Sequence, residues 1–252
     1  MEKPREVSLE KLREEPYASV ICYPKPKKAD VEKRLKELQK LSVTSLDFVG
    51  EKEVFGSRVL GKGCVGIVVL ANWKNTKIAL KIRRVDADRA RMQQEAKLLR
   101  MANSVNVGPK LLGVSRNFLL MEFVDGVLLP EWLEAIRKKE ALRRVLREVL
   151  EQCWRLDNIC LDHGELSHAP KHIIIKKKGE PVIVDFESAS LNRKPSNVTS
   201  LCQFLFIGSA TAKKIAEKLE EKARTELVET LRSYKKERSL ENFGEVLMVC
   251  GL

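Results

Sequence analysis

Hydrophobic and polar residues alternate in several short runs of the first half of the chain, a pattern typical of strands in an antiparallel sheet. Turns that contain glycine or asparagine separate the first three runs, and a helical pattern precedes the last two. The predicted strands are residues 54–60, 67–73, 77–83, 111–114 and 118–123, and the predicted helix is residues 88–102. The sequence therefore predicts a β-rich lobe of three strands, one helix and two strands.

After Gly126 the hydrophobic period changes to that of α-helices. Residues 141–158 place six apolar side chains, from Leu142 to Cys153, on one face. Two short strands at 173–176 and 181–185 flank a turn that contains Gly179. The other predicted helices are residues 130–138, 198–206, 210–232 and 240–248. A reduced, mainly helical lobe is expected here.

Residues 1–45 predict an appended helical extension that docks on the first lobe. Its predicted elements are a helix at 8–14 capped by Ser8, an extended stretch from Tyr17 to Tyr23, and a helix at 29–41 with an apolar stripe. A stiff connector between them carries Lys25, Lys27 and Lys28. The predicted organisation is an extension at 1–45, an N-lobe at 46–124 and a C-lobe at 125–252.

Composition indicates an ordinary globular protein rather than a membrane or disulfide-framed one. The 252 residues are 44% hydrophobic, which is enough for a sizeable core, and the apolar runs are shorter than a membrane helix requires. The six cysteines lack a C-x-x-C pair, so most are expected to be buried thiols. With no signal-peptide pattern, we expect a cytoplasmic protein. The high charged fraction favours a thermophile.

The net charge of +12 and the isoelectric point near 9.4 favour an anionic partner. Residues 51–116 contain 14 Lys and Arg against 5 Asp and Glu, so most of the excess lies there. A solvated basic face and a phosphate-contacting surface both explain this distribution. The second explanation predicts an RNA-binding face that includes Arg83, Arg84 and Arg89 together with Lys25, Lys27 and Lys28.

A glycine-rich motif, G-x-G-x-x-G-x-V, lies between two predicted strands. Its members are Gly61, Lys62, Gly63, Gly66 and Val68. Glycines without Cβ atoms allow backbone amides to approach the phosphates of a nucleotide. A strand rather than a helix is predicted after the glycines, which excludes the Rossmann fingerprint. A plain glycine-rich hairpin is the alternative.

A lysine and a glutamate follow in the order that a nucleotide site needs. Lys81 ends the run Ile78-Ala79-Leu80-Lys81, which matches the strand motif V-A-I-K whose lysine contacts the α- and β-phosphates. Glu95 on the next helix is the expected ion-pair partner that positions Lys81. An ordinary i,i+4 pair on the helix surface is the alternative for Glu95.

These motifs, with two later ones, make residues 48–210 resemble the protein kinase-like superfamily. His163-Gly164-Glu165-Leu166 stands where H-R-D-L is expected, and Asp185-Phe186-Glu187 where D-F-G is expected. The resemblance implies an α+β fold, namely a small two-lobed protein kinase-like fold, and a phosphotransferase that uses ATP and Mg²⁺. The implied nucleotide-binding residues are Gly61, Lys62, Gly63, Gly66, Val68, Ala79, Lys81, Glu95 and the hinge residues Met121, Glu122 and Phe123.

The departures from the kinase pattern shape the predicted chemistry. Gly164 replaces the arginine, as in small atypical kinases of the RIO and Bud32 types, so a phosphorylated activation loop is not expected to dock there. Glu165 replaces the base aspartate and is expected to accept the hydroxyl proton. His172 directly precedes the predicted strand, as the metal-binding asparagine does in the family, and Lys171 precedes it with a charge for the γ-phosphate.

The predicted metal residues are Asp185, His172 and Glu187, of which Asp185 is the main Mg²⁺ ligand. Imidazole is a poor ligand for Mg²⁺, so His172 is expected to meet phosphate or a softer metal instead. A zinc site formed by His163, His168 and His172 is a rival hypothesis, although the spacing lacks the usual pattern. His163 itself is expected to be a packed residue that supports the loop.

The combination of H-G-E-L-S with K-H-I-I-I, and the lack of an A-P-E sequence after Asp185, resemble an archaeal group called predicted serine/threonine protein kinases. This group includes RNA kinases that phosphorylate the 2′-hydroxyl of a variable-loop uridine in tRNA. The resemblance implies this activity, which stabilises tRNA against heat, and tRNA as the partner. An atypical protein serine/threonine kinase and a pseudokinase that acts as a binding module in an RNA-related complex are the alternatives.

Overall fold

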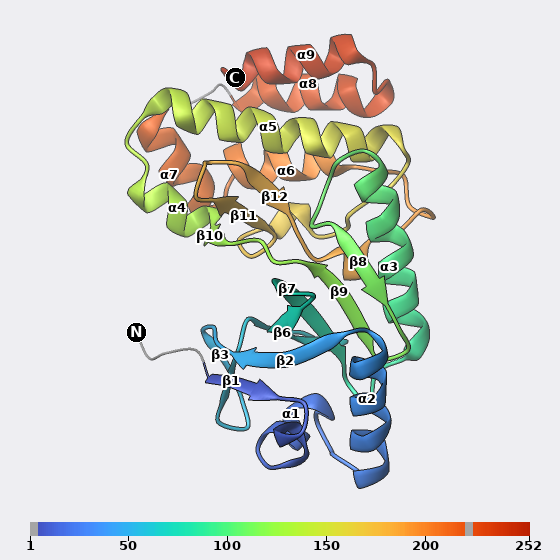
Figure 1. Cartoon of the computed structure of the whole chain (residues 1–252). Helices are drawn as coiled ribbons and strands as arrows, with labels where there is room; N and C mark the ends of the chain where they lie inside the picture. The colour runs from blue at the N-terminus through green and yellow to red at the C-terminus, as the bar shows by residue number, and fades with distance from the viewer. Residues whose placement is uncertain (1–4, 220–223) are drawn as a thin grey trace. The chain divides into compact units, whose positions relative to one another are not determined.

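The computed structural model describes residues 5–219 and 224–252, apart from the side chains of Arg5 and of residues 89–91. The chain forms two compact units. The first consists of residues 1–100 and 109–123, and the second of residues 101–108 and 124–252. The first unit is rich in strands and the second in helices, which confirms the predicted α+β class (Figure 1).

An antiparallel sheet is the centre of the first unit (Figure 1). Its strands are β1 (Arg5–Ser8), β2 (Val43–Phe48), β5 (Gly61–Lys62), β6 (Gly66–Trp73), β7 (Thr76–Arg83), β8 (Leu111–Val114) and β9 (Phe118–Glu122). The order across the sheet is β1, β2, β6, β7, β9, β8, with β5 paired to β6. The alternating residues Ile78, Leu80 and Ile82 of β7 are buried, as the period of two predicts.

Helices cover the sheet of the first unit. Helix α2 (Lys28–Lys40) buries Val31, Leu35 and Leu38 in the same core as the strand residues, so the predicted apolar stripe is confirmed. Helix α3 (Arg89–Ser104) packs Met92 and Ala96 against Leu119 of β9. The sheet is thereby a firm support for side chains that project from its central strands.

The first residues of the chain fold differently from the prediction. The expected helix at 8–14 is wrong except for a 3₁₀ turn at Lys11–Arg13, because Ser8 ends strand β1 and pairs with Ser45 of β2. The stretch expected to be extended forms helix α1 (Tyr17–Ile21). Pro16 precedes this helix, where its missing N–H costs nothing. The extension is therefore part of the first unit and of its sheet.

The predicted strand at 54–60 is a hairpin followed by a separate short strand. Strands β3 (Lys52–Val54) and β4 (Ser57–Val59) pair across a two-residue turn, Phe55-Gly56. Both turn residues have positive φ, 49° and 71°, which suits the right-handed twist of a tight hairpin. The prediction failed because a phenylalanine occupies a position where asparagine or glycine would have signalled the turn.

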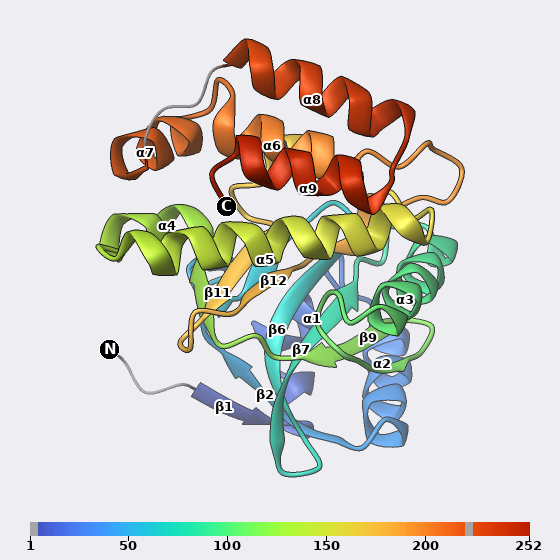
Figure 2. The ribbon, with the colours of Figure 1, turned by 90° about the horizontal axis from the view of Figure 1, so that it is seen from above.

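Helix α5 is the spine of the second unit. The helices of this unit are α4 (Leu129–Ala135), α5 (Lys139–Asn158), α6 (Asn197–Phe206), α7 (Ala210–Lys218), α8 (Arg224–Lys236) and α9 (Leu240–Val249). A small sheet is formed by β10 (Gly126–Leu128), β11 (Ile173–Lys176) and β12 (Pro181–Ile183). Figure 2 shows α5 between this sheet and the pair α6 and α9. Trp154 of α5 stacks on Phe243 of α9.

A buried carboxylate joins three helices of the second unit. Asp157 of α5 accepts hydrogen bonds from the amides of Asn197 and Val198, at 2.9 and 3.3 Å, and from the hydroxyl of Tyr234 at 2.9 Å. Two of these donors are otherwise orphan amides at the start of α6, so Asp157 caps that helix from a neighbouring one. Burial raises the pKa of the Asp157 carboxyl. This cap fixes the start of α6 relative to α5.

Two other predictions for the second unit need correction. The helix expected at 210–232 ends at Lys218 because Leu219 is extended, and part of the predicted span, residues 220–223, lies outside the described residues. Strand β10 was not predicted, since three residues are too few to show a period. Among the described residues, no helix has the length and apolar character needed to cross a membrane.

Candidate active site

The glycine-rich motif forms a strand, a turn and a second strand. The amide of Gly63 donates to the carbonyl of Gly66 at 2.8 Å, and β5 pairs with β6 beyond this turn. A Cβ atom on Gly66 would lie 2.8 Å from the carbonyl oxygen of Ile82, so only glycine fits there. A strand follows the glycines, as predicted, and a helix N-terminus is not part of this phosphate-binding candidate.

The N-terminal extension braces the glycine turn through an aromatic ring. The ammonium of Lys62 lies 5.2 Å from the centre of the Tyr23 ring, and the guanidinium of Arg84 lies 4.9 Å from it. The carbonyl of Tyr23 accepts a hydrogen bond from the amide of Val85 at 2.8 Å. The sequence did not predict this contact, because nothing in the motif indicates a partner 39 positions before Lys62.

Lys81 and Glu95 form a buried ion pair. The Nζ atom of Lys81 lies 2.9 and 2.8 Å from the two carboxylate oxygens of Glu95, and the side chains are only 5% and 2% exposed. An ion pair this deeply buried is costly to desolvate, so its retention is typical of a site that uses the charge. The alternative of a surface i,i+4 pair for Glu95 is wrong, because Glu95 points into the unit.

The pairing of the strands places the predicted nucleotide residues on one face of the sheet. Val68 lies opposite Lys81, and Ala79 lies opposite Met121. Since Ala79 and Lys81 are two residues apart, all four side chains share that face. Glu122, by contrast, uses its amide to bond the carbonyl of Lys110 at 2.8 Å. The Glu122 amide is therefore not available to adenine in this structure. The predicted adenine contacts would involve other backbone groups of the hinge, including those of Phe123.

In the second unit, the segment that contains His163 is tied to the segment after Asp185. Asp162 and Ser190 exchange two backbone hydrogen bonds, at 3.0 and 2.8 Å. The guanidinium of Arg193 donates to the Asp162 carboxylate at 2.8 Å and to the carbonyl of Ser188 at 2.5 Å. The catalytic-loop candidate is therefore held by contacts of Asp162 with Ser190 and Arg193.

Gly164 makes room for these contacts. Its φ is +91°, and a Cβ atom there would lie 2.3 Å from Nη2 of Arg193 and 2.7 Å from the carbonyl oxygen of Ser188. A larger residue would therefore both strain the backbone and displace Arg193. The replacement of the kinase arginine by Gly164 is thus a geometric requirement of this loop.

Glu165 is held at both carboxylate oxygens. The hydroxyl of Ser188 donates to Oε1, and Nε2 of His172 lies 2.8 Å from Oε2. Nε2 has no hydrogen-bond partner among the described residues, so this second contact is close but lacks hydrogen-bond geometry. The Ser188 hydrogen bond, and then the charge of His172, lower the pKa of Glu165. The side chain remains 35% exposed, which suits a base that meets a substrate.

His163 is packed, as predicted, and does not face a ligand. The side chain is fully buried, its Nε2 atom contacts the carbonyl of Val184 at 3.1 Å, and its ring meets Phe186 edge-on at 5.0 Å. Burial, then the neighbouring His172, lowers the pKa of His163 to about 4. At neutral pH His163 is a neutral spacer beneath the loop.

Of the three predicted metal ligands, the structure favours the carboxylates Asp185 and Glu187 over His172. Asp185 is exposed and has a left-handed backbone, φ 70°, which is unusual for a residue other than glycine and typical of strained active-site positions. Glu187 follows in a 3₁₀ turn. His172 is fully buried against Glu165, so its predicted role as a metal or phosphate ligand does not fit. An exposed carboxylate fits Mg²⁺, which takes one or two such ligands together with substrate phosphates.

The zinc hypothesis fails in the part of the chain that the structure describes, where no three His, Cys, Asp or Glu side chains are arranged to hold a metal ion. His168 is exposed, whereas His163 and His172 are buried. Lys171 is exposed beside them, and its predicted contact with a γ-phosphate stays a prediction.

The predicted RNA face also needs correction. Arg83 is buried and binds the side chain of Asn117 and two backbone carbonyls, so it is structural. Arg84 is paired with Asp86. The side chain of Arg89 lies outside the described residues. The three connector lysines, Lys25, Lys27 and Lys28, are exposed. Net charge alone could not distinguish the buried cations from the exposed ones.

A strand-rich unit with a buried lysine–glutamate pair and a helical unit with an exposed carboxylate after a short hairpin define the protein kinase-like class. A family model, the RIO domain, matches residues 70–203, more than half of the chain. The chain belongs to the RIO domain family, whose members are atypical kinases, and this membership supports a phosphotransferase that uses ATP and Mg²⁺. The matched span includes Lys81, Glu95, Glu165 and Asp185 but begins after the glycine motif.

One relative is an uncharacterized protein of Methanocaldococcus jannaschii. It is 30% identical over 99 residues, which are 39% of this chain and 83% of that protein.

Four residues that organise the loop were missed by sequence reasoning: Asp162, Ser188, Arg193 and Asn197. Ser188 directly follows Asp185-Phe186-Glu187, which was the available signal for it. Asn197 accepts a hydrogen bond from the amide of His163 at 2.8 Å and lies 34 residues away, a distance that no local pattern spans.

Proposed function

We propose that this protein is an ATP-dependent RNA kinase that phosphorylates the 2′-hydroxyl of a variable-loop uridine in tRNA. The observation that carries the proposal is the arrangement of Glu165. Its carboxylate is partly exposed, kept ionised by Ser188 and His172, and mounted on a loop that Arg193 and Asp162 hold in place. A rigidly held, ionised carboxylate is the group that orients and deprotonates an attacking hydroxyl.

The two units contribute residues with separate tasks in the proposed reaction. Lys81, positioned by Glu95, neutralises charge on the α- and β-phosphates, and the glycine turn offers backbone amides. Asp185, with Glu187, would hold Mg²⁺, which when bound neutralises charge on the transferred group. The hydroxyl oxygen bonds to the γ-phosphorus, the bond to the β–γ bridging oxygen breaks, and the proton passes to Glu165. ADP and the phosphorylated ribose are the products.

Support for an RNA acceptor comes from the resemblance to archaeal RNA kinases and from the charge of the chain. The net charge is +12, and exposed lysines occur in the N-terminal connector. Phosphate backbones recruit such proteins through counterion release. The second candidate function is an atypical protein serine/threonine kinase, which the family membership favours without defining the acceptor.

The test is a transfer assay with γ-labelled ATP, in which purified protein meets either unmodified tRNA or protein substrates. The proposal expects label in tRNA. Label in protein alone would favour the second candidate, and ATP binding with no transfer to any substrate would favour a pseudokinase.

Substitutions with matched controls test the roles proposed for Glu165 and Asp185. We expect Glu165→Gln to lower kcat about 10²- to 10⁴-fold, the range for loss of a general base. Asp185→Asn should abolish the response to Mg²⁺. Glu134→Gln and Asp30→Asn are the controls, because they remove the same charges from α4 and α2 without touching the proposed site. Equal activity of Glu165→Gln and Glu134→Gln would contradict the assignment of the base.

A further inference from the structure

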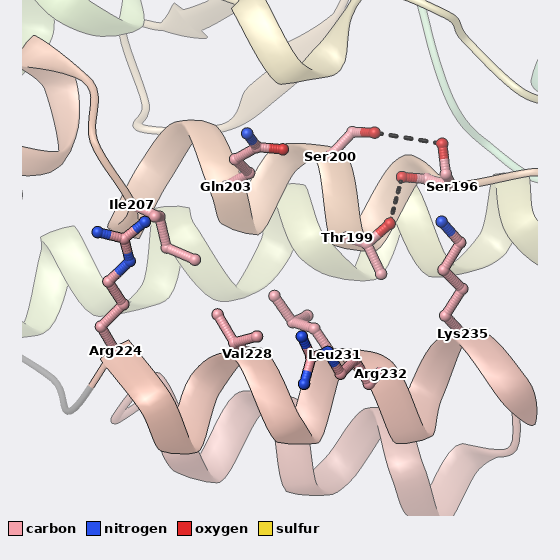
Figure 3. Close-up of a pocket in the computed structure, with 10 residues that line it drawn as sticks. All are labelled: Ser196, Thr199, Ser200, Gln203, Ile207, Arg224, Val228, Leu231, Arg232 and Lys235. Carbon is pink, nitrogen blue, oxygen red and sulfur yellow. Dashed lines mark hydrogen bonds between the residues drawn. The ribbon is translucent and has the colours of Figure 1, made fainter.

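A pocket of about 430 Å³ lies between helices α6 and α8 of the second unit (Figure 3). Its lining combines apolar side chains with hydroxyl, amide and cationic groups. The lining residues are Ser196, Thr199, Ser200, Gln203, Ile207, Arg224, Val228, Leu231, Arg232 and Lys235. Its volume is within the range of ligand-binding sites.

The cations all come from one face of α8. Positions 224, 228, 231, 232 and 235 follow helical spacing, so Arg224, Arg232 and Lys235 point to the same side as the apolar Val228 and Leu231. Figure 3 shows these side chains directed towards α6. The pocket therefore has a cationic wall.

The opposite wall is polar and uncharged. Helix α6 contributes the hydroxyls of Thr199 and Ser200 and the amide of Gln203, and Ser196, which precedes the helix, contributes a third hydroxyl. The hydroxyls of Ser196 and Ser200 lie 3.2 Å apart, and Thr199 donates to the carbonyl of Ser196. Within the described residues, none of the ten lining side chains is a carboxylate, and no ion pair holds Arg224, Arg232 or Lys235. Cations that face a polar, uncharged wall suit the binding of phosphate oxygens.

The spacing of the cations favours a chain of phosphates over a single one. Arg224 and Lys235 are 11 residues apart, which is about 16 Å along a helix at 1.5 Å per residue. Along the axis of a stacked duplex each strand carries a phosphate about every 3.4 Å, so a span of this length meets several phosphates rather than one. The apolar side chains between the cations, Val228 and Leu231, would contact sugar or base surfaces.

One end of the pocket is connected to the catalytic-loop candidate. Ser196 donates from its amide and its hydroxyl to the Asp162 carboxylate, at 3.1 and 3.4 Å. Asp162 directly precedes His163 and also binds Arg193. A strand that lies along the pocket would thus reach the residues that hold Glu165 in place.

We propose that the groove between α6 and α8 binds the phosphate backbone of the RNA substrate and guides the strand towards Glu165. This inference rests on the proposed RNA kinase function and adds a binding surface, in the second unit, to the exposed lysines of the first. A phosphate chain, rather than an acidic polypeptide, is the occupant that the spacing of the cations and the lack of aromatic side chains in the lining favour.

The test compares two triple variants of the full chain that lose the same charge. The pocket variant, which combines Arg224→Ala, Arg232→Ala and Lys235→Ala, removes the three cations of the pocket. Lys178→Ala, Lys213→Ala and Lys236→Ala remove three exposed lysines that do not line the pocket. Binding of fluorescein-labelled tRNA is measured between 50 and 200 mM salt, and melting temperatures confirm that both variants are folded.

We expect the pocket variant to lose about tenfold or more of its tRNA affinity at low salt, and the slope of log affinity against log salt to become shallower by about 2 to 3. The control variant should keep most of its affinity and most of its slope. Equal losses in the two variants would overturn the proposal. So would competition by polyglutamate as strong as that by unlabelled tRNA of equal charge.

Failure of the proposed function gives a different result. If the parent protein transfers no phosphate to tRNA but the pocket variant alone loses tRNA affinity, the RNA kinase assignment fails and the groove remains an RNA-binding site. If the parent protein phosphorylates tRNA and the pocket variant does so with unchanged KM, the kinase assignment holds and the groove proposal is wrong.

Discussion

The Nε2 atom of His172 lies 2.8 Å from the Oε2 atom of Glu165, and the imidazole is fully buried. His172 occupies the position before β11 where the kinase pattern places a metal-binding asparagine. A buried ring that faces a carboxylate is suited to position it and is poorly suited to bind a hard cation. In this account His172 acts through Glu165.

Substitution of His172 tests this role. We expect His172→Ala to lower kcat about 10- to 100-fold, as loss of a supporting residue commonly does, and to leave the Mg²⁺ concentration for half-maximal activity unchanged. Lys171→Ala, the exposed neighbour, is the comparison. A markedly higher Mg²⁺ requirement in His172→Ala alone would show that the imidazole is a ligand and that its positioning role is wrong.

Ser188 sets the acid side of the pH profile. Its hydroxyl stabilises the charged form of Glu165 and is the largest cause of that residue's lowered pKa. Because a protonated carboxyl cannot accept a proton, a lower pKa extends activity to lower pH. We expect Ser188→Ala to raise this pKa, so the acidic limb of kcat/KM against pH moves to higher pH. An unmoved limb would mean that Glu165 is not the titrating base.

Alanine substitutions at Gly164 and Gly208 distinguish backbone strain from a steric clash with neighbouring atoms. Both have positive φ, +91° and +73°, but only at Gly164 would a Cβ atom meet Arg193 and the Ser188 carbonyl, since nothing lies within 4 Å at Gly208. We expect Gly164→Ala to cost about 1–3 kcal/mol of unfolding free energy and most of the activity. Gly208→Ala should be milder and remain active. Denaturant unfolding measures the stability of the two variants, and transfer assays measure their activity. Equal effects of the two substitutions would contradict the role of Gly164 in making room for Arg193.

Substitutions in the buried pair of Lys81 and Glu95 distinguish a role in stability from a role in catalysis. Lys81→Met removes the buried cation that faces the Glu95 carboxylate, at a cost of about 3–5 kcal/mol, whereas the double variant Lys81→Met with Glu95→Leu should recover most of it. Both variants are expected to lose at least about 100-fold in transfer, because the phosphate contact is gone. Activity that returns together with stability in the double variant would show a purely structural pair.

Long periodic elements were predictable from the sequence because their pattern repeats. The bounds of strands β6 and β7 and of helices α2 and α5 were predicted to within one or two residues. The failures lie where the pattern is short or non-local. The pairing of Ser8 with Ser45 required knowledge of a partner strand, and three-residue β10 shows no period.

The site was predictable as a set of residue types but not as a set of contacts. The motifs identified Lys81, Glu165 and Asp185, because each stands next to a strand or loop with a recognisable pattern. They could not show that His172 would turn to Glu165, that Arg83 would be buried, or that Arg193 would fill the space over Gly164. Those contacts depend on packing between distant segments.

The central claim, transfer of the γ-phosphoryl group of ATP to a ribose hydroxyl, is tested most directly with two tRNA transcripts that differ by one oxygen. One carries uridine at the modified variable-loop position and the other carries 2′-deoxyuridine there. The account predicts transfer of γ-label to the first and none to the second, and loss of the first signal in Glu165→Gln. Equal labelling of both transcripts, or label that enters only protein, would contradict it.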